Sequence, residues 1–371
     1  MNVVFRVDAS IEMGIGHVMR CLTLADALRD EGAHCHFVCR EHLGNLIDQI
    51  ASRGHQVYSL PLCQVGQHPD NIQIGKFRPS HFHWLGCDWL TDARQTTDCI
   101  GLLNIDWLIV DHYALDDCWE KYLRTICSKI MVIDDLADRN HDCDLLLDQT
   151  FGRSNQDYKQ QVPAACTIVT GAKYALLRPE FAALRSYSLK RRKEPRLGQL
   201  LISMGGIDKE NATSKVLQAL KGSPLHKDCQ IIVVMGENAP WLENIRFHAK
   251  ELLWKVEVKV KVANMAQLMA DSDLAIGAAG STSWERCCLG LPTLMIVLAD
   301  NQEVIASALH KGDAALNIGA VSDPYLLNNL KNIFDDFFSN RKMLNNMSAS
   351  AYAVTAGQGT SLIVDRLLEK A

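Results

Sequence analysis

Apolar stretches alternate with amphipathic segments along the first half of the chain. The apolar stretches have the length of buried strands, and most of them end in polar residues. They predict strands at VVFRVDAS (3–10), HCHFVCR (34–40), HQVYSL (55–60), WLIVDHY (107–113), KIMVIDDL (129–136) and CDLLLDQT (143–150). After the first strand, apolar side chains share one helical face, which comprises Val18, Cys21, Leu22, Ala25 and Leu28. A second helix is predicted over LGNLIDQIASRG (43–54), where Gly54 ends it.

A second alternating series follows residue 198. Its predicted strands are QLLISMGG (199–206), CQIIVVMG (229–236), VEVKVKV (256–262), DLAIGAAG (273–280) and LPTLMIVLAD (291–300). Its predicted helices are NATSKVLQALKG (211–222), MAQLMADS (265–272) and EVIASALHKG (303–312). Two consecutive series of this kind predict an α/β fold with two doubly wound, Rossmann-like domains. Ligands of such sheets lie beyond the carboxyl ends of the strands, so we expect the site in an intervening cleft.

The domain boundaries are predicted from changes in composition. The basic, proline-containing segment SLKRRKEPRLG (188–198) is expected to be a linker. It would separate an N-terminal domain (1–187) from a nucleotide-binding domain (199–340), which a helical tail (341–371) follows. Residues 63–90 are rich in His, Pro, Gly and Trp, and they predict a long irregular excursion.

Composition narrows the class of protein. The chain has 371 residues, 48% of them hydrophobic and 22% charged, which is typical of a folded globular protein. A formal net charge of −5 does not indicate the basic surface by which proteins bind nucleic acid. The N-terminal apolar run is interrupted by Arg6 and Asp8, and LPTLMIVLA (291–299) is too short for a membrane span. The 13 scattered cysteines predict reduced thiols and a cytoplasmic location without membrane insertion.

The loop MGIGHVM (13–19) is the first candidate site, because it joins a strand to a helix. It could hold a dinucleotide, a phosphate, or a substrate facing a catalytic base. The dinucleotide fingerprint G-x-G-x-x-G places Gly14 and Gly16 correctly, but Met19 stands where its third glycine should be. His17 in the first helical turn is therefore interpreted as a general base on water. Asp8, at the end of the preceding strand, is expected to orient the imidazole or a substrate hydroxyl.

A second candidate site lies in GAAGSTSWERCCLGLP (277–292). Gly280, Ser281 and Thr282 open a helix with amides and hydroxyls that suit a diphosphate. Glu285, one turn later, can accept hydrogen bonds from the two hydroxyls of a ribose. Two further predicted strands end in residues that could contact the same ligand. Gly205 and Gly206 follow one of them, and Asn301 and Gln302, whose amides could contact sugar hydroxyls or N-acetyl groups, follow the other.

Acidic residues follow two strands of the first series, at VDHY (110–113) and IDDLADRNHDCD (133–144). Asp134 and Asp135 are adjacent carboxylates, but no recognisable metal-ligand loop surrounds them. We therefore interpret these residues, and Tyr113, as substrate or turn contacts. No metal and no cofactor are predicted.

Several of these segments together resemble one known family. They are GIGHVMRCLTLA, VDHYALDDCWE, IDDLADRNHDCDLLLDQT, YALLRPEF, SMGGID and AGSTSWERCCLGLPTLMI followed by NQ. In number and order they are similar to the nucleotide-sugar hydrolase of bacterial pseudaminic acid biosynthesis. The resemblance runs from about residue 4 to the last predicted helix.

The resemblance implies a two-domain fold of the glycosyltransferase-B type. It also implies hydrolysis of UDP-2,4-diacetamido-2,4,6-trideoxy-β-L-altropyranose to UDP and the free sugar, without metal or cofactor. His17 matches the family's catalytic histidine, and the nucleotide would contact Gly205, Gly206, Ser281, Thr282 and Glu285. The alternatives are a glycosyltransferase of the same fold with a UDP-sugar donor, or a nucleotide-sugar binding protein without catalysis. The oligomeric state is not predicted.

Overall fold

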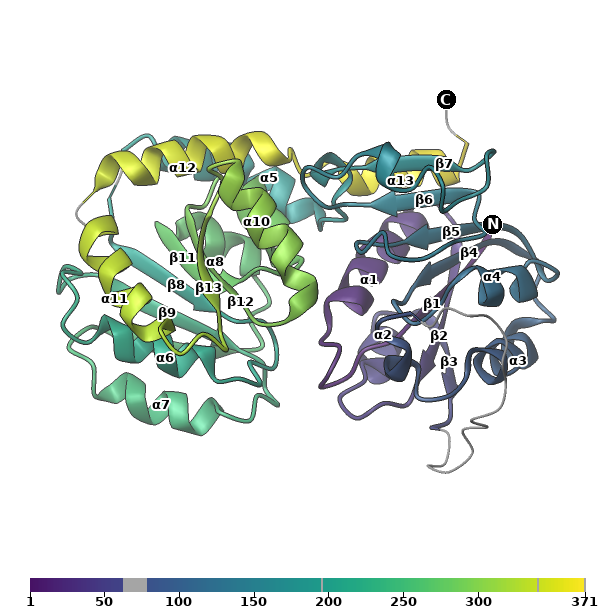
Figure 1. Ribbon diagram of the computed structural model, residues 1–371, viewed down its shortest axis with the longest axis horizontal. Helices are drawn as coiled ribbons and strands as arrows, with labels where there is room; N and C mark the ends of the chain where they lie inside the picture. Colours follow the sequence, from purple (N-terminus) through teal and green to yellow (C-terminus); the bar gives the residue numbers. More distant parts are fainter. Residues whose placement is uncertain (63–78, 195, 339, 370–371) are drawn as a thin grey trace. The chain divides into compact units, whose positions relative to one another are not determined.

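The computed structural model describes residues 1–62, 79–194, 196–338 and 340–369 (Figure 1). The chain divides into two compact units. Unit 1 comprises Met1–Leu176 with Gly359–Ala371, and unit 2 comprises Leu177–Gln358. The predicted class of fold, two doubly wound α/β domains, is confirmed because each unit is built on its own parallel sheet.

The boundaries of the units differ from those expected from composition. Residues 188–192 of the expected linker lie at the end of helix α5 (Pro179–Arg191) and are packed into unit 2. The hydroxyl of Ser188 donates to the Leu289 carbonyl at 2.7 Å, and Arg192 Nη1 donates to the Ser272 carbonyl at 2.6 Å. Buried contacts of this kind hold the start of the basic segment to unit 2, so its polar composition does not mark a linker.

The expected helical tail is also divided between the units. Helices α11 (Leu326–Phe337) and α12 (Arg341–Val354) belong to unit 2, whereas α13 (Gly359–Leu367) belongs to unit 1. Ile363 and Val364 join the core of unit 1, and Trp107 Nε1 donates to the Leu367 carbonyl at 3.1 Å.

In the described residues, the sheet of unit 1 has seven parallel strands in the order β3-β2-β1-β4-β5-β6-β7. The strands are β1 (Asn2–Val7), β2 (His34–Arg40), β3 (Gln56–Leu60), β4 (Ile105–Asp111), β5 (Cys127–Ile133), β6 (Leu145–Asp148) and β7 (Thr167–Thr170). Helices α1 (Gly16–Asp30), α2 (Ile47–Ser52) and α13 pack on one face, while α3 (Trp89–Ile100) and α4 (Asp117–Leu123) pack on the other. The described residues of this unit also form three short 3₁₀ helices, η1 (Phe82–Leu85), η2 (Asn155–Asp157) and η3 (Ala172–Tyr174).

Some elements of unit 1 were not predicted from the hydrophobic pattern. β7 is a short strand at the edge of the sheet, and only Val169 is buried, so it has no apolar run. The expected irregular excursion at 63–90 lies partly outside the described residues, which omit 63–78. Its described end forms η1 and the start of α3.

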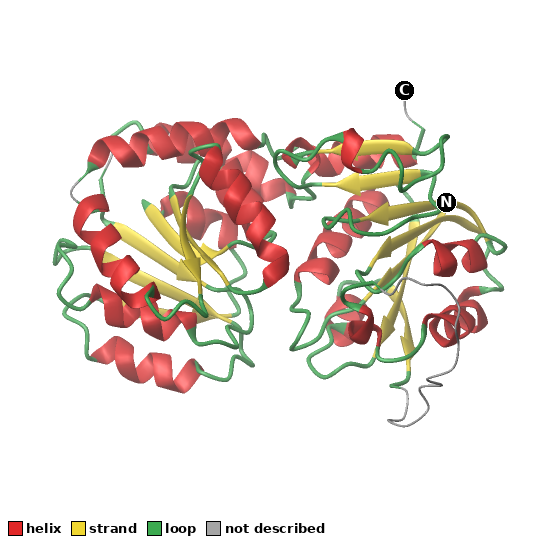
Figure 2. Cartoon of the chain, viewed as in Figure 1, coloured by secondary structure: helices red, strands yellow, loops and turns green. Residues whose placement is uncertain are grey.

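The sheet of unit 2 has six parallel strands, in the order β10-β9-β8-β11-β12-β13 among the described residues. Figure 2 draws the strands as yellow arrows and the helices in red. The strands are β8 (Gln199–Ser203), β9 (Gln230–Met235), β10 (Val256–Val260), β11 (Leu274–Ala278), β12 (Thr293–Val297) and β13 (Leu316–Ala320). Its remaining helices are α6 (Ala212–Leu220), α7 (Leu242–Lys250), α8 (Met265–Asp271), α9 (Thr282–Cys288), α10 (Glu303–Lys311) and η4 (Asp300–Gln302). A hydrophobic core of unit 2 lies on one face of this sheet, where α6, α7, α11 and α12 contribute apolar side chains.

Each sheet has a point at which its strand order reverses. In unit 1 the chain proceeds from β1 to β2 on one side and later returns to β4 on the other. In unit 2 the corresponding central strands are β8 and β11. Loops that leave the carboxyl ends of such neighbouring strands diverge and leave room for a ligand. Both candidate sites predicted from the sequence lie at these two points.

No helix in the described part of the chain is both long enough and apolar enough to cross a membrane.

Candidate active site

The loop after β1 brings His17 to the start of α1. Ser10 and Gly14 form a short bridge, in which the Gly14 amide donates to the Ser10 carbonyl at 2.9 Å. Gly14 has a φ of 77°, a left-handed conformation that glycine adopts without strain. Helix α1 then begins at Gly16, with no acidic residue in its first turn and no side-chain cap. The predicted strand–glycine–helix turn is therefore present, with His17 in its first helical turn.

His17 forms a close pair with Asp111, the last residue of β4. The distance from His17 Nδ1 to Asp111 Oδ1 is 2.6 Å, and only 9% of His17 is exposed. Because a carboxylate can only accept, Nδ1 carries the hydrogen in this pair. The Nε2 atom is then the ring nitrogen with a lone pair available to accept a proton. This arrangement orients and polarises a general base.

Arg20 holds Asp111 in its ionised form. Arg20 Nε lies 2.6 Å from Asp111 Oδ2, and Arg20 Nη2 lies 2.7 Å from Asp111 Oδ1. The guanidinium therefore donates a hydrogen bond to each carboxylate oxygen. Burial opposes ionisation of Asp111, but the charges of Arg20 and His17 outweigh it and hold the pKa of that carboxyl well below its usual range. Asp111 therefore keeps its negative charge beside His17 throughout the physiological pH range.

Tyr113 and Asp135 complete the surroundings of His17. Arg20 Nη1 lies 2.5 Å from Asp135 Oδ2, and the Tyr113 hydroxyl donates to the same oxygen at 3.0 Å. The rings of His17 and Tyr113 meet edge to face, with their centroids 4.5 Å apart. Trp84 stacks next to Tyr113 at 5.8 Å. Tyr113, which we expected to contact substrate, is buried and packs against the imidazole.

The structure corrects the role expected for Asp8. Asp8 is buried, and its Oδ1 atom lies 2.7 Å from Arg6 Nη1 and accepts from the Arg40 amide at 2.7 Å. Its Oδ2 atom lies 3.2 Å from His112 Nε2. Alternate side chains of a strand point to opposite faces, and Arg6 and Asp8 point away from α1. Asp8 therefore does not orient His17, which Asp111 does instead.

Asp134 is a turn residue. It accepts from the Leu136 and Ala137 amides at 3.2 and 2.8 Å, and its other oxygen lies 2.8 Å from Arg139 Nη1. Of the two adjacent carboxylates, only Asp135 belongs to the cluster around His17.

In unit 2, the other predicted residues lie together at the carboxyl ends of three neighbouring strands. Gly205 and Gly206 follow β8, Ser281 and Thr282 follow β11, and Asn301 follows β12. Gly205 has a φ of 84°, so it forms a left-handed turn. In the described residues, the backbone amides of Gly280, Ser281 and Thr282 have no hydrogen-bond acceptor. Donors of this kind are available to an anion.

Two more residues lie beside these strand ends, Gln302 and Arg286, and of these Arg286 was not among the predicted site residues. Gln302 accepts from the Leu298 amide at 3.0 Å, and its Nε2 atom lies 3.8 Å from the position that a β-carbon would take on Gly280. Arg286 is buried beneath the loop and donates to the Ala278 carbonyl at 2.7 Å. The sequence places both within the quoted motifs, but nothing in the pattern shows that their side chains turn toward the loop.

Glu285 is a partly buried carboxyl in α9. Its side chain is 18% exposed, and Oε1 lies 3.7 Å from Arg178 Nη2. Burial raises the pKa of Glu285 to about 7, and Arg178 opposes this only in part. A carboxylate with poor hydration is available to accept hydrogen bonds from ligand hydroxyls.

This raised pKa predicts a pH-dependent difference in stability between the wild type and Glu285→Gln. The pKa in the unfolded chain is near 4.5, so the folded protein binds more protons between that pH and about 7. The stability contributed by the protonated carboxyl is present below pH 4.5 and is lost as the pH rises through 7. We expect the unfolding free energy of the wild type to fall by roughly 2 kcal/mol relative to the variant between pH 5 and pH 8. Urea unfolding of both proteins at the two pH values measures this change. If the difference in unfolding free energy between the wild type and Glu285→Gln were the same at pH 5 and pH 8, the raised pKa would be contradicted.

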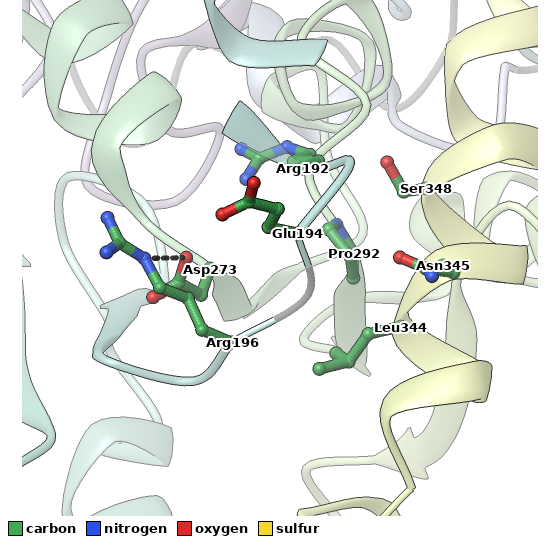
Figure 3. Close-up of a pocket in the computed structure, with 8 residues that line it drawn as sticks. All are labelled: Arg192, Glu194, Arg196, Asp273, Pro292, Leu344, Asn345 and Ser348. Atoms are coloured by element: carbon green, nitrogen blue, oxygen red, sulfur yellow. Dashed lines mark ion pairs between the residues drawn. The ribbon is translucent and has the colours of Figure 1, made fainter. Parts of the chain in front are cut away.

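A small cavity lies near the amino ends of strands in the same sheet (Figure 3). Its lining includes Arg192, Asp273 and Pro292, and its volume is about 20 Å³. Asp273 precedes β11 and accepts from the Gly198 and Gln199 amides at the start of β8. The cavity therefore lies at the amino ends of the strands and has room for about one water, so it is too small to hold a nucleotide.

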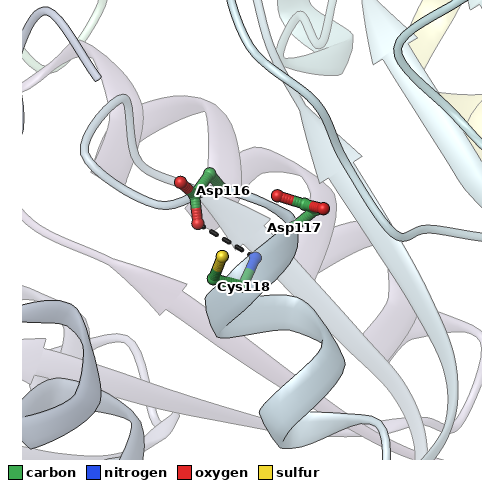
Figure 4. Close-up of side chains that lie close together, drawn as sticks. All are labelled: Asp116, Asp117 and Cys118. Carbon is green, nitrogen blue, oxygen red and sulfur yellow. Dashed lines mark hydrogen bonds between the residues drawn. The ribbon is translucent and has the colours of Figure 1, made fainter. Parts of the chain in front are cut away.

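A cluster of possible metal-ligand atoms lies at the start of α4 (Figure 4). It comprises Asp116, Asp117 and Cys118, whose ligand atoms lie within 4.8 Å of one another. Asp116 caps the helix by accepting from the Cys118 amide at 3.0 Å, and Asp117 pairs with Lys121 at 2.6 Å. Burial raises the pKa of Asp116 and of the Cys118 thiol. These contacts explain the cluster as a helix N-terminus.

Comparison with known proteins gives one domain model and several relatives. The model of the glycosyltransferase family 28 C-terminal domain matches residues 201–367. A UDP-2,4-diacetamido-2,4,6-trideoxy-β-L-altropyranose hydrolase from Campylobacter jejuni is 28% identical over 84% of this chain and 97% of its own length. An uncharacterised protein of Methanocaldococcus jannaschii is 27% identical over 81% of this chain, which spans 56% of that relative. The spore coat polysaccharide biosynthesis protein SpsG of Bacillus subtilis is 32% identical over 46% of this chain and half of its own length.

Solved structures share the fold along nearly the whole chain. MurG of Acinetobacter baumannii matches with a TM-score of 0.70 at 16% identity, covering 99% of both chains. Arabidopsis thaliana UGT89C1 complexed with UDP matches with a TM-score of 0.65 at 12% identity, also covering 99% of both. The chain thus has the two-domain α/β fold of the glycosyltransferase-B type and resembles the UDP-2,4-diacetamido-2,4,6-trideoxy-β-L-altropyranose hydrolase family.

Proposed function

We propose that this protein is a nucleotide-sugar hydrolase that cleaves UDP-2,4-diacetamido-2,4,6-trideoxy-β-L-altropyranose into UDP and the free sugar. The observation that carries the proposal is the pair of His17 and Asp111, 2.6 Å apart at the point where the first sheet reverses its strand order. The Campylobacter jejuni relative supports the substrate, since it bears the name of this hydrolase. The shared fold supports the wider class of enzymes that act on nucleotide sugars.

In the proposed reaction, His17 Nε2 takes a proton from water. The water oxygen forms a bond to the anomeric carbon, and the bond from that carbon to the phosphate oxygen breaks. UDP departs with the electron pair of that bond. Asp111 stabilises the imidazolium that forms, because it remains ionised while His17 gains its charge.

Unit 2 is proposed to bind the nucleotide. The amides beyond β11, with the hydroxyls of Ser281 and Thr282, would donate to the diphosphate, and Gly205 and Gly206 would let their backbone approach it. Glu285 would accept from the ribose hydroxyls. Asn301, half-buried beyond β12, is proposed to contact an acetamido group of the sugar.

The test is release of UDP from the diacetamido-altrose nucleotide in the absence of any acceptor, with UDP-N-acetylglucosamine as the control. We expect release from the first substrate, and release that persists in EDTA because no step is assigned to a metal. In ¹⁸O-labelled water the label should enter the free sugar. Label in UDP would show attack at phosphorus and contradict the proposed bond cleavage.

A glycosyltransferase is the second candidate, and the family 28 C-terminal domain favours it. Such an enzyme would bind UDP tightly but release it from the donor only when an acceptor is supplied. The assay without acceptor therefore separates the two functions. A binding protein without catalysis would release no UDP under either condition.

Replacing Glu285 with alanine is expected to weaken UDP binding by roughly 1–3 kcal/mol, because the ribose hydroxyls lose their acceptor. Isothermal titration calorimetry measures this change. Glu180→Ala is the matched control, since Glu180 also pairs with Arg178, at 2.9 Å. Unchanged UDP affinity in Glu285→Ala, or an equal loss in the control, would remove Glu285 from the nucleotide site.

A further inference from the structure

Arg286 is a buried cation beneath the loop that joins β11 to α9. It is 2% exposed. Nη2 donates to the Ala278 carbonyl at 2.7 Å and to the Ser283 hydroxyl at 3.0 Å, and Nη1 donates to the Thr282 hydroxyl at 3.2 Å. Its Nε atom has no hydrogen-bond partner among the residues that the structure describes. A β-carbon on Gly277 would approach Nη1 to 2.6 Å, so the glycine leaves room for the guanidinium.

No carboxylate in the described residues lies within ion-pair distance of this guanidinium. Glu285, its neighbour in the chain, is directed toward Arg178 at 3.7 Å instead. Burying a charge that has no ion-pair partner lowers the stability of the folded protein, so such a charge is retained where it serves a function.

Arg192 shows how the same unit accommodates another buried arginine without a carboxylate. Its guanidinium donates to the Met269, Ser272 and Leu289 carbonyls. These lie at the C-terminal ends of α8 and α9, which carry partial negative charge. Arg192 is therefore compensated by helix ends.

Arg286 has no ion-paired carboxylate among the described residues, and the negative charge of Glu285 acts on it only from beyond ion-pair distance. Its neighbours are one strand carbonyl and two hydroxyls, and the amides of the same loop are themselves unpaired donors. The charge therefore adds to the positive potential of the loop. The hydrogen bonds also occupy a lone pair of the Thr282 oxygen, which leaves the Thr282 hydrogen free to donate outward.

We propose that Arg286 is a positioning residue for diphosphate recognition, whose counter-charge is supplied by the pyrophosphate group of the bound nucleotide. Arg286 does not touch the ligand. It acts through the loop at 278–283, by its charge and by directing the Thr282 hydroxyl outward. This inference rests on the proposed nucleotide site and adds the residue that makes that site selective for a diphosphate over a neutral nucleoside.

The test compares binding of UDP and uridine by calorimetry in the wild type, Arg286→Met and Arg286→Gln. We expect both variants to bind UDP about tenfold more weakly, because a unit charge near the phosphates is lost. Uridine affinity should stay within about twofold, since uridine carries no phosphate. Arg286→Lys should restore most of the preference for UDP. A role confined to folding would lower both affinities together and leave their ratio unchanged.

Arg192→Gln is the matched control, because it also removes a buried arginine that has no carboxylate partner in the described part of the chain. We expect it to lower the melting temperature and to leave the ratio of UDP to uridine affinity unchanged. An unchanged ratio in folded Arg286→Gln would overturn the role of Arg286. If the wild type bound no UDP at all, the nucleotide site itself would be refuted, so the two failures are distinguishable. Inorganic pyrophosphate provides a further check, since it should raise the melting temperature of the wild type more than that of Arg286→Gln.

Discussion

Replacing His17 with alanine is expected to lower kcat for hydrolysis by roughly a thousandfold or more. The variant loses the only group that we assign to proton transfer from water, and general base catalysis of this kind contributes about 10²–10⁴-fold. UDP affinity should be unchanged, because the residues proposed to bind UDP are in unit 2. Steady-state UDP release and calorimetry with UDP measure the two quantities separately.

His83→Ala is the matched control for this prediction. His83 lies in η1 of the same unit, is exposed, and contacts Trp84 near the candidate base without contacting His17. Its replacement should leave kcat unchanged. A loss of UDP affinity in His17→Ala that equals its loss of rate would refute the division of roles between the units.

Replacing Asp111 with asparagine is expected to lower kcat by about a hundredfold or more, with little change in KM. The amide group of asparagine can donate to His17 Nδ1, which would move the ring hydrogen to Nε2 and abolish its capacity to accept a proton. The neutral amide also cannot stabilise the imidazolium. Unfolding free energy should fall by about 3 kcal/mol, because Arg20 loses a buried partner that it holds with two donors.

Asp134→Asn controls for the loss of a buried carboxylate. Asp134 follows β5 and pairs with Arg139 at 2.8 Å, but it does not contact His17. We expect a comparable loss of stability with kcat retained. If Asp111→Asn kept the activity of the wild type per folded molecule, the pair with His17 would have no role in proton transfer.

Much of the fold follows from the sequence because parallel strands buried on both faces leave a strong local signal. The runs around Val4, Ile109 and Val132 consist mostly of apolar residues, and all three lie in the sheet of unit 1. The turn at Gly14 is equally local, since glycine is favoured at a positive φ. His17 could therefore be predicted at the start of a helix from the sequence alone. The edge strand β7 escaped prediction because only one of its residues is buried.

The partner of His17 depended on information that the sequence pattern does not contain. Asp8 and Asp111 both follow apolar strands, and Asp8 is the nearer to His17 along the chain. Pairing of β1 with β4 brings Asp111 beside Val7, and the alternation of side chains along β1 turns Asp8 to the opposite face. Strand order and side-chain direction together decide which carboxylate meets the imidazole.

The sequence by itself therefore determined the two α/β series, the glycine turns and the positions of His17, Ser281 and Glu285 in their motifs, because each depends on residues close together in the chain. Only the tertiary structure decided that Ser188 and Arg192 of the basic segment are buried, that α13 returns to unit 1, and that Arg286 has no ion-pair partner among the described residues. These properties depend on contacts between residues far apart in the chain. The physical reason is that burial and charge compensation are set by packing, whereas turns and periodicity are set locally.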